Sequence, residues 1–327
     1  MNIKKVGLTA LAGSLVAASA YAGEMSVAGS ASLNVEHTNG GASSSGKTFS
    51  MGNQLTFSGS GELDNGLTVS LSFVLDQNDD STTANGATKN DDAGTPFDSH
   101  SVSISSDALG TLKFSGEGGS SASTALDTTA AGDIWDNGSG FYAAGSSPLY
   151  GESGDNSMMY TLPSFIDGAT IKASYSPGGA GGPSATSYAI GYTGVEGLSL
   201  DYGVGEIATV GNEADITTMK ASYAYSSFTL SYSNTEAEHD LSSNTDEEIS
   251  SWNLAYTVSD DLSIAYGVET IETEGQANDE EGEKFNVSYT TGGVTISATQ
   301  YNFENIGGTA GAAGEKERWA LSATFAF

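Results

Sequence analysis

Two short acidic runs in this chain could ligate a divalent cation. The runs Asp76–Asp80 and Asn90–Asp92 supply carboxylate and amide oxygens, which are the ligands that Ca²⁺ prefers. Neither run has the ligand spacing of an established calcium-binding loop. The pattern favours a solvated acidic loop, with Ca²⁺ binding as the alternative.

Groups that could carry out catalysis are poorly arranged. The histidines His37, His100 and His239 are far apart, and no metal-ligand spacing links them. Asp98, Ser99 and His100 include a nucleophile and base types, but neighbours on a strand point to opposite faces. We therefore expect no enzymatic activity and no resident cofactor.

Acidic residues dominate the charge of the chain. It carries 41 aspartates and glutamates against 10 lysines and arginines, a formal net charge of -31. Nucleic acid is excluded as a partner, because there is no basic patch to neutralise phosphates. The excess acid indicates either a solvated acidic surface or a passage that attracts cations.

The first residues have the pattern of an export signal. A basic segment, Met1–Lys5, is followed by an apolar run, Val6–Ala18, and by Ala20-Tyr21-Ala22, a small-residue cleavage site. The apolar run is too short to span a bilayer as a helix. We expect residues 1–22 to be a cleaved signal peptide and residues 23–327 to form one cysteine-free domain.

The rest of the chain alternates apolar and small polar residues, as strands with two unlike faces do. In the last segment Trp319, Leu321, Ala323, Phe325 and Phe327 occupy every second position. The same alternation predicts sixteen strands, at about 25–37, 49–63, 67–76, 98–106, 111–118, 156–163, 169–176, 185–193, 198–206, 214–225, 228–237, 248–258, 262–271, 283–290, 294–303 and 316–327.

The expected connections alternate between long polar loops and tight turns. The long ones are Thr38–Thr48, Gln77–Phe97, Gly119–Asp155, Pro177–Ser184, Ile207–Glu213, Glu238–Glu247, Glu272–Gly282 and Glu304–Glu315. A soluble sandwich has no reason to sort its loops in this way, whereas a barrel with one rim outside the cell and the other in the periplasm does. The apolar strand faces would then meet lipid, and the hydroxyl-rich faces a water-filled lumen.

These observations predict an all-β protein, a 16-stranded antiparallel transmembrane β-barrel in the outer membrane. The sixteenth strand must pair with the first, because an open sheet edge in lipid leaves backbone groups without hydrogen bonds. Phe327 is then expected near the periplasmic interface, where aromatic residues are favoured.

One stretch resembles a known family. Residues 156–177, NSMMYTLPSFIDGATIKASYSP, are similar to the sixth and seventh strands of Gram-negative general porins, and Asn156, Ser157, Tyr160, Pro163, Phe165 and Gly168 match their pattern. The terminal Phe327 resembles the family's outer-membrane assembly signal. With the sixteen-strand plan, the resemblance covers the whole mature chain.

The resemblance implies a homotrimer of water-filled barrels in outer-membrane lipid. It also implies that the third long loop, here Gly119–Asp155, folds into the lumen and narrows it. Asp127, Asp133 and Asp136 of that loop are then candidate carboxylates at the pore constriction.

The opposite wall departs from the family, which often carries an arginine cluster there. The mature chain has one arginine, Arg318, but parity turns four lysines toward the lumen. They are Lys113, Lys172, Lys220 and Lys284. Parity also turns Asp201 and Glu269 inward, and Asp201 joins the first three lysines as a candidate constriction residue. Each lysine could equally be a solvated residue of the wall.

The expected function is passive diffusion of small hydrophilic solutes and ions through a fixed aqueous pore, with a preference for cations. Acidic segments that include Glu236–Asp240, Asp246–Glu248 and Asp279–Glu283 are expected at the mouth, where a single sign of charge concentrates counter-ions. The alternative is a barrel with a closed lumen and a structural or adhesive role, in which acidic loops bind Ca²⁺ or an external partner.

Overall fold

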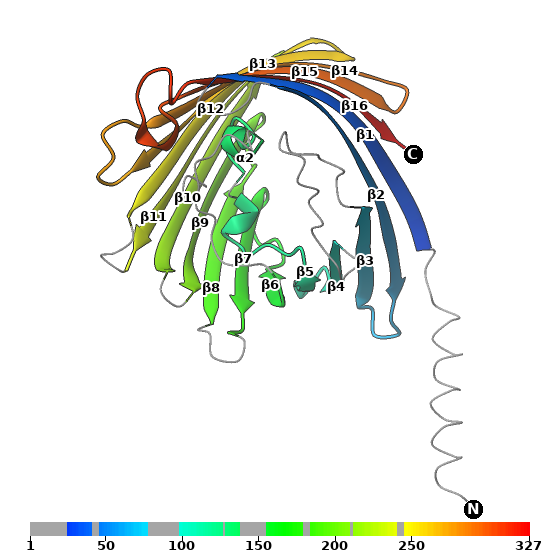
Figure 1. Ribbon diagram of the computed structural model, residues 1–327. Helices are drawn as coiled ribbons and strands as arrows, with labels where there is room; N and C mark the ends of the chain where they lie inside the picture. Colours follow the sequence, from blue (N-terminus) through cyan, green and yellow to red (C-terminus); the bar gives the residue numbers. More distant parts are fainter. Residues whose placement is uncertain are drawn as a thin grey trace, which may run out of the picture.

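The chain forms one closed antiparallel barrel of sixteen strands, each paired with its neighbours in sequence and the last with the first (Figure 1). This computed structural model describes residues 25–40, 46–77, 98–126, 128–137, 155–178, 184–209, 212–240 and 245–327. The strands are β1 (Met25–Gly40), β2 (Gly46–Glu62), β3 (Thr68–Gln77), β4 (Ser99–Ser106), β5 (Gly110–Glu117), β6 (Ser157–Thr161), β7 (Ala169–Ser176), β8 (Ala185–Tyr192), β9 (Leu198–Thr209), β10 (Asn212–Tyr225), β11 (Phe228–His239), β12 (Glu247–Ser259), β13 (Leu262–Thr273), β14 (Glu280–Thr291), β15 (Val294–Glu304) and β16 (Lys316–Ala326). The predicted fold class is confirmed.

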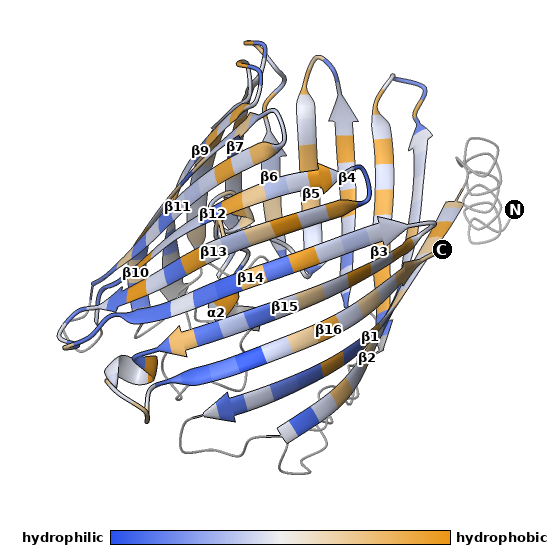
Figure 2. Ribbon diagram, turned by 90° about the horizontal axis from the view of Figure 1, so that it is seen from above, coloured by the Kyte–Doolittle hydropathy of each residue, from blue (hydrophilic) through white to orange (hydrophobic). Residues whose placement is uncertain are grey.

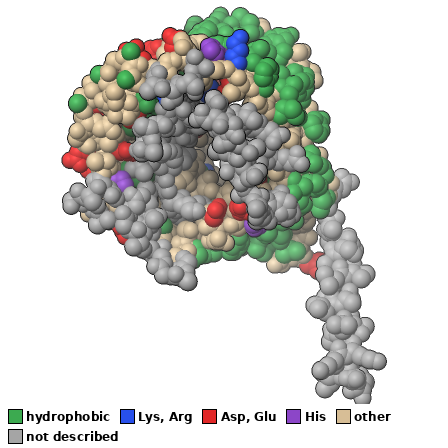
Figure 3. Space-filling view, viewed as in Figure 1, with side chains coloured by type: hydrophobic (Ala, Val, Ile, Leu, Met, Phe, Trp, Pro, Cys, Tyr) green, Lys and Arg blue, Asp and Glu red, His purple; other side chains and the backbone are tan. Residues whose placement is uncertain are grey.

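Alternation along the strands gives the barrel an apolar outer surface. Outward-facing side chains such as Phe49, Leu230 and Ile296 are exposed, although they are large and hydrophobic. Figure 2 shows hydrophobic bands across the middles of β14 and β16, with hydrophilic residues toward one end of each. Figure 3 shows hydrophobic side chains gathered on the outer surface beside β1 and β2. In water such a surface would be unfavourable, so its natural surroundings are lipid.

The first and last strands close the sheet through backbone pairing. Ser30 lies opposite Ala326, and the ladder continues to Gly40 opposite Lys316. Beyond the last ladder pair, Gly29 N donates to Phe327 O at 2.7 Å, and Phe327 N donates to Gly29 O at 2.9 Å. The pairing of the first and last strands inferred from the sequence is therefore confirmed.

Tight turns and longer connections are sorted between the two rims. The turn after β2 is closed by Leu63 N donating to Leu67 O at 2.8 Å, with Gly66 at φ 80°. Only glycine adopts that positive φ without steric cost, so the Asp64-Asn65-Gly66 signal is a true turn. The long connections follow the odd-numbered strands, at the rim opposite these turns.

The prediction of one long loop is wrong. The sequence predicts a connection over Ile207–Glu213, but β9 continues to Thr209 and β10 begins at Asn212, opposite it. Similarly, β1 and β2 reach Gly40 and Gly46, and shorten the expected Thr38–Thr48 loop. Backbone pairing does not require apolar side chains, so a hairpin can extend beyond the membrane belt through polar residues.

Helical structure in the described part of the chain is confined to short turns, namely η1 (Thr124–Leu126), α2 (Ile134–Asn137) and η2 (Ile306–Gly308). Within the described residues, no helix combines the length and apolar character that a bilayer crossing requires. Both η1 and α2 lie inside the ring of strands (Figure 1). The largest buried hydrophobic cluster of the described chain forms where α2 meets the inner wall.

Candidate functional site

The connection after β5 enters the barrel and follows its inner wall. Its described parts, residues 118–126 and 128–137, are called the inner loop here. It contacts β7 through Ser174 and β8 through Ser187, and farther along it contacts β13 and β14 through Glu269 and Lys284. The inward third loop expected from the sequence is therefore present.

Serine hydroxyls of the wall accept hydrogen bonds from the backbone of the inner loop. Ala122 N donates to Ser174 Oγ at 2.9 Å, and Ser123 N donates to Ser187 Oγ at 3.2 Å. A second pair of bonds follows: Ala130 N donates to Ser233 Oγ at 2.8 Å, and Ala131 N donates to Ser251 Oγ at 2.9 Å. A buried N–H group without a hydrogen-bond acceptor costs about 1–3 kcal/mol. Because each of these N–H groups has a serine hydroxyl as its acceptor, docking of the loop avoids that cost.

Glu269 of β13 is the acidic anchor of the inner loop. Its side chain is 1% exposed and accepts hydrogen bonds from Thr129 Oγ1, from Ile134 N at 3.3 Å and from Trp135 N at 3.4 Å. A buried carboxylate is tolerated when several donors surround it, as they do here. The last two donors are N–H groups of the first turn of α2, which have no partner within the helix.

Two of the predicted lumenal lysines bind carbonyl oxygens of the inner loop. Lys220 Nζ of β10 donates to Thr128 O at 2.6 Å. Lys284 Nζ of β14 donates to Ala131 O, and to Gly132 O at 3.4 Å. The loop is thus held through its N–H groups by serines and Glu269, and through its carbonyl groups by lysines.

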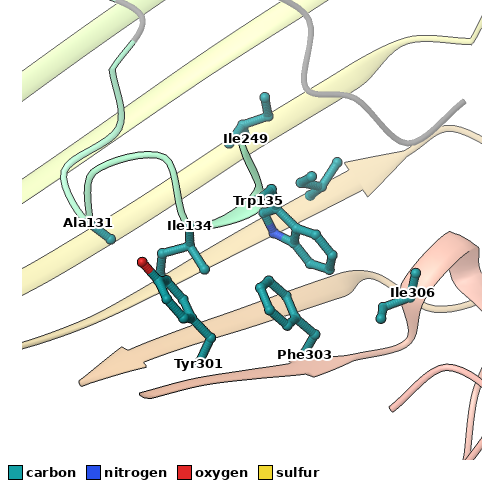
Figure 4. Close-up of a cluster of buried hydrophobic side chains, with 8 residues drawn as sticks. Ala131, Ile134, Trp135, Ile249, Tyr301, Phe303 and Ile306 are labelled. Carbon is teal, nitrogen blue, oxygen red and sulfur yellow. The ribbon is translucent and has the colours of Figure 1, made fainter. Parts of the chain in front are cut away.

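Apolar packing completes the docking of α2. Ile134 and Trp135 are fully buried, and the ring of Trp135 lies 5.0 Å from that of Phe303 on β15 (Figure 4). Ala131, Ile249, Ile271, Tyr301 and Ile306 complete the cluster. A Cβ added to Gly282 would lie 2.8 Å from Ile134 Cγ2, so a glycine on the wall leaves the room that the loop needs.

The structure describes the three loop acids predicted at the constriction to different extents. Asp133 is on the inner loop, where its Oδ1 accepts from Thr129 N at 2.8 Å, so its carboxylate closes a local turn. Asp136 belongs to α2, but its side chain lies outside the described residues, as does all of Asp127. A constriction role for these acids stays a prediction.

The remaining wall residues point into the lumen as parity predicts. On β5, Lys113 lies between Leu112 and Phe114, whose side chains face outward, so Lys113 faces the lumen. On β7, Lys172 has the same parity as Ser174, which binds the inner loop. Asp201 of β9 stands directly opposite Lys220 of β10. All three are half-buried, and their part in conduction stays a prediction.

The opposite side of the lumen is lined by hydroxyl groups. One serine from each of six neighbouring strands forms a continuous cross-strand row, made of Ser26, Ser58, Ser72, Ser101, Ser115 and Ser157. Ser26 Oγ and Ser58 Oγ share a hydrogen bond of 2.8 Å. Ser115 and Ser157 are buried, whereas the serines of β1–β4 in this row are exposed or half-buried and can exchange hydrogen bonds with water and with polar solutes.

Many acids expected at the mouth are on the outer face of strands. On β11, Glu236 and Glu238 have the parity opposite to that of Ser233, which faces inward. On β12, Glu248 has the parity opposite to that of the inward-facing Ser251. Glu281 and Glu283 of β14 have the parity opposite to Lys284. These carboxylates lie beyond the apolar belt, toward the long loops and on the outside of the barrel. They therefore contribute less negative charge to the lumen than their position in the sequence suggests.

The two acidic runs, expected to be solvated with Ca²⁺ binding as the alternative, are largely outside the described residues, which include Asp76 but not 78–97. Both interpretations of these runs stay predictions. Elsewhere in the described chain, no group of three or more histidine, aspartate or glutamate residues is placed to hold a metal ion.

Sequence reasoning missed the residues that hold the loop. The serines were assigned only to a hydrophilic wall, and Ile134 and Trp135 were not singled out. Their apolar character was the available signal, because exposed loops seldom carry adjacent large apolar residues. The pairs Phe141-Tyr142 and Leu149-Tyr150 of the same connection share that character, so the signal does not single out Ile134 and Trp135.

Several solved structures share this fold. An anion-selective porin from Comamonas acidovorans superposes with a TM-score of 0.69 at 15% identity, covering 93% of this chain and 99% of that chain. Salmonella typhi OmpF, solved in complex with daunomycin, gives 0.68 at 12% identity, with 93% and 98% covered. A mutant of Rh. blastica porin gives 0.63 at 17% identity, with 93% and 100% covered.

Sequence comparison gives the family. No match was found among curated proteins. The sequence profile described as Gram-negative porin matches residues 7–327, nearly the full length. Together with the sixteen-stranded barrel, this match shows that the chain belongs to the Gram-negative porins and is an outer-membrane channel protein.

Proposed function

We propose that this porin is a passive diffusion channel for small hydrophilic solutes and ions, with a modest preference for cations. The observation that carries the proposal is the inner loop, which is bound along one side of the lumen by Ser174, Ser233, Glu269 and Lys284. A loop held in this way narrows the passage to a fixed width and leaves the hydroxyl-lined wall of β1–β4 facing water.

The hydroxyl wall supports the passage of uncharged polar solutes. A recess of about 320 Å³ opens on β1–β4 and is lined mainly by serines, among them Ser58, Ser70 and Ser103. Hydroxyl groups both donate and accept hydrogen bonds, so they can replace part of the hydration of a sugar or polyol without binding it tightly.

The cation preference rests on the charge balance of the whole chain, which is -31. A mouth of one sign attracts counter-ions and repels co-ions. The opposing contributions are the lumenal lysines and the outward orientation of acids such as Glu236 and Glu283. Because Lys220 and Lys284 are engaged by loop carbonyls, their charges are close to the loop rather than to the hydroxyl wall.

Reversal potentials across a tenfold KCl gradient test the preference. We expect potassium to be the more permeant ion, with a weaker effect at high salt, because the Debye length falls from ~30 Å at 0.01 M to ~3 Å at 1 M. A potential that shows chloride as the more permeant ion at both low and high salt would overturn the cation preference and leave the channel function intact.

Single-channel conductance and liposome swelling test the channel itself. We expect large steady conductance steps, and a size limit for sugars that rises when the Gly119–Asp155 connection is shortened. An absence of conductance from correctly folded protein would reject the proposal in favour of a closed barrel. An unchanged size limit would show that the inner loop does not form the constriction.

Two further parts of the proposal concern maturation and assembly. We infer that the leader is removed after Ala22, which N-terminal sequencing of the exported protein can check. We also infer a homotrimer, the assembly that the resemblance to Gram-negative general porins implies. Light scattering in detergent measures the oligomer, and a monomeric mass would contradict it.

A further inference from the structure

A polar recess of about 310 Å³ lies between the inner loop and the wall of β9–β11. Thr129 and Ala130 bound it on one side. Ser199, Ser222 and Ser231 form a cross-strand row along its floor, near the tight turns of these strands. The recess therefore lies on the tight-turn side of the loop, toward the rim that is expected to face the periplasm.

Two opposite charges face this recess from neighbouring strands. Asp201 of β9 and Lys220 of β10 are directly paired in the ladder, and both side chains are half-buried. Serine hydroxyls and the loop backbone form the rest of the polar lining. One anion and one cation therefore lie side by side in a site that water reaches only in part.

Different neighbours hold the two charges. Lys220 Nζ donates to Thr128 O of the loop at 2.6 Å. Asp201 Oδ2 accepts from Ser199 Oγ at 3.3 Å, on the side of the floor. Lysine has three N–H donors and a carboxylate has several acceptor positions, so both groups keep hydrogen-bonding capacity for a solute.

We propose that this recess is a low-affinity binding site for zwitterionic solutes of the α-amino acid class, an inference that rests on the proposed channel function. The carboxylate of the solute faces Lys220, its ammonium group faces Asp201, and the serine floor accepts or donates the remaining hydrogen bonds. Charges that are complementary and already oriented lower the cost of binding, because the site needs no rearrangement.

A solute with one charge satisfies half of this site and leaves the other wall charge opposite a neutral group. A neutral solute satisfies neither charge. Four small molecules with one carbon skeleton separate these cases: alanine is zwitterionic, alaninamide is cationic, lactate is anionic and lactamide is neutral. Their similar sizes remove the sieving effect of the constriction from the comparison.

The experiment measures the conductance of single full-length channels in dilute KCl while each solute is added. We expect alanine to reduce the conductance in a saturable way, at lower concentration than alaninamide or lactate, and lactamide to show no saturation. Dilute salt is chosen because screening weakens contacts between partly exposed charges.

Asp201→Asn is the principal variant, because the hydrogen bond of Asp201 is to Ser199 of the wall, whereas Lys220 binds the inner loop. It should raise the half-saturating concentration of alanine by about two- to fivefold, the range for one partly exposed charge contact. Asp215→Asn is the matched control, since Asp215 lies on the outward face of β10 and should leave the value unchanged. Lys220→Met should act in the same direction as Asp201→Asn.

The outcomes separate this inference from the channel function. Channels that conduct, yet respond to alanine as they do to lactamide, would overturn the zwitterion site alone. The same holds if Asp201→Asn and Asp215→Asn have equal effects. Protein that is folded but does not conduct would overturn the proposed function as well.

Discussion

Glu36 of β1 and Arg318 of β16 form an ion pair across the seam where the first and last strands meet. Arg318 Nε donates to Glu36 Oε2 at 3.0 Å, and Nη2 contacts the same oxygen. Thr48 Oγ1 donates to the other oxygen of Glu36 at 2.9 Å, and the guanidinium lies 5.4 Å from the ring centre of Tyr301. The one arginine of the sequence therefore lies at a contact that joins β1, β2, β15 and β16 inside the barrel.

Replacing Glu36 by Gln should weaken this seam. The side chains of Arg318 and Glu36 are 17% and 26% exposed, so the loss is expected to be about 1–2 kcal/mol rather than that of a fully buried pair. Thermal unfolding followed by heat-dependent electrophoretic mobility measures the change. Glu317→Gln, on the outward face of β16 next to Arg318, is the control. Equal midpoints for the two variants would argue against a stabilising role for the pair.

Replacing Glu269 by Gln should release the inner loop without opening the barrel. Glutamine replaces one carboxylate oxygen by an NH₂ group, which cannot accept the hydrogen bonds that Ile134 N and Trp135 N donate to Glu269. The loss of this acceptor at a buried site should weaken docking of the loop by about 2–4 kcal/mol. Single-channel recordings should show larger or noisier conductance, while the thermal midpoint of the barrel stays near that of the parent. Glu272→Gln, outward on the same strand, should resemble the parent. Quiet, unchanged conductance in Glu269→Gln would contradict this role.

Trp135 can report directly on loop docking. The sequence has three tryptophans, so replacing Trp252 and Trp319 by Phe leaves Trp135 as the fluorophore. Because Trp135 is 0% exposed, we expect blue-shifted emission and slow quenching by acrylamide. Adding Glu269→Gln should shift the emission to the red and speed the quenching. A signal that is already red and readily quenched before that change would mean that the loop is not docked in solution.

Adding a methyl group at Gly282 should displace α2. The new Cβ would lie 2.8 Å from Ile134 Cγ2, which is closer than van der Waals contact allows, and overpacking of this kind costs about 1–3 kcal/mol. Gly59→Ala is the matched control, because its added Cβ meets Met25 Cα at 3.9 Å. The Trp135 emission should change for Gly282→Ala alone. If both variants keep the parent emission spectrum, Ile134 does not pack closely against Gly282 in solution.

Deleting Phe327 should impair assembly in the outer membrane. Phe327 N and O both bond to Gly29, so the deletion removes two hydrogen bonds at the seam as well as the terminal aromatic ring. We expect a lower yield of folded barrel in outer-membrane fractions. Phe325→Leu, which keeps the backbone pairing, is the control. Normal yield from the truncated chain would contradict the prediction.

The barrel can be predicted from the sequence alone. Successive side chains of a strand point to opposite faces of the sheet because of local backbone geometry. Since one face of the wall meets lipid and the other meets water, every strand must alternate apolar and polar residues. Strand number, the sorting of loops and the inward parity of Lys113, Lys172, Asp201 and Lys220 all follow from it. The error at Ile207–Glu213 has the same origin, because alternation marks the part of a hairpin in lipid and does not mark its extension into water.

The tertiary structure alone decided what the inward residues do. Parity placed Lys220 and Glu269 in the lumen, but their partners, Thr128 O and the N–H groups of α2, are about 90 and 135 residues away in sequence. No local pattern encodes which loop atoms reach which strand. The docking depends on complementary shape and on the pairing of every buried donor and acceptor, and these conditions are met only when the loop and the closed wall are brought together.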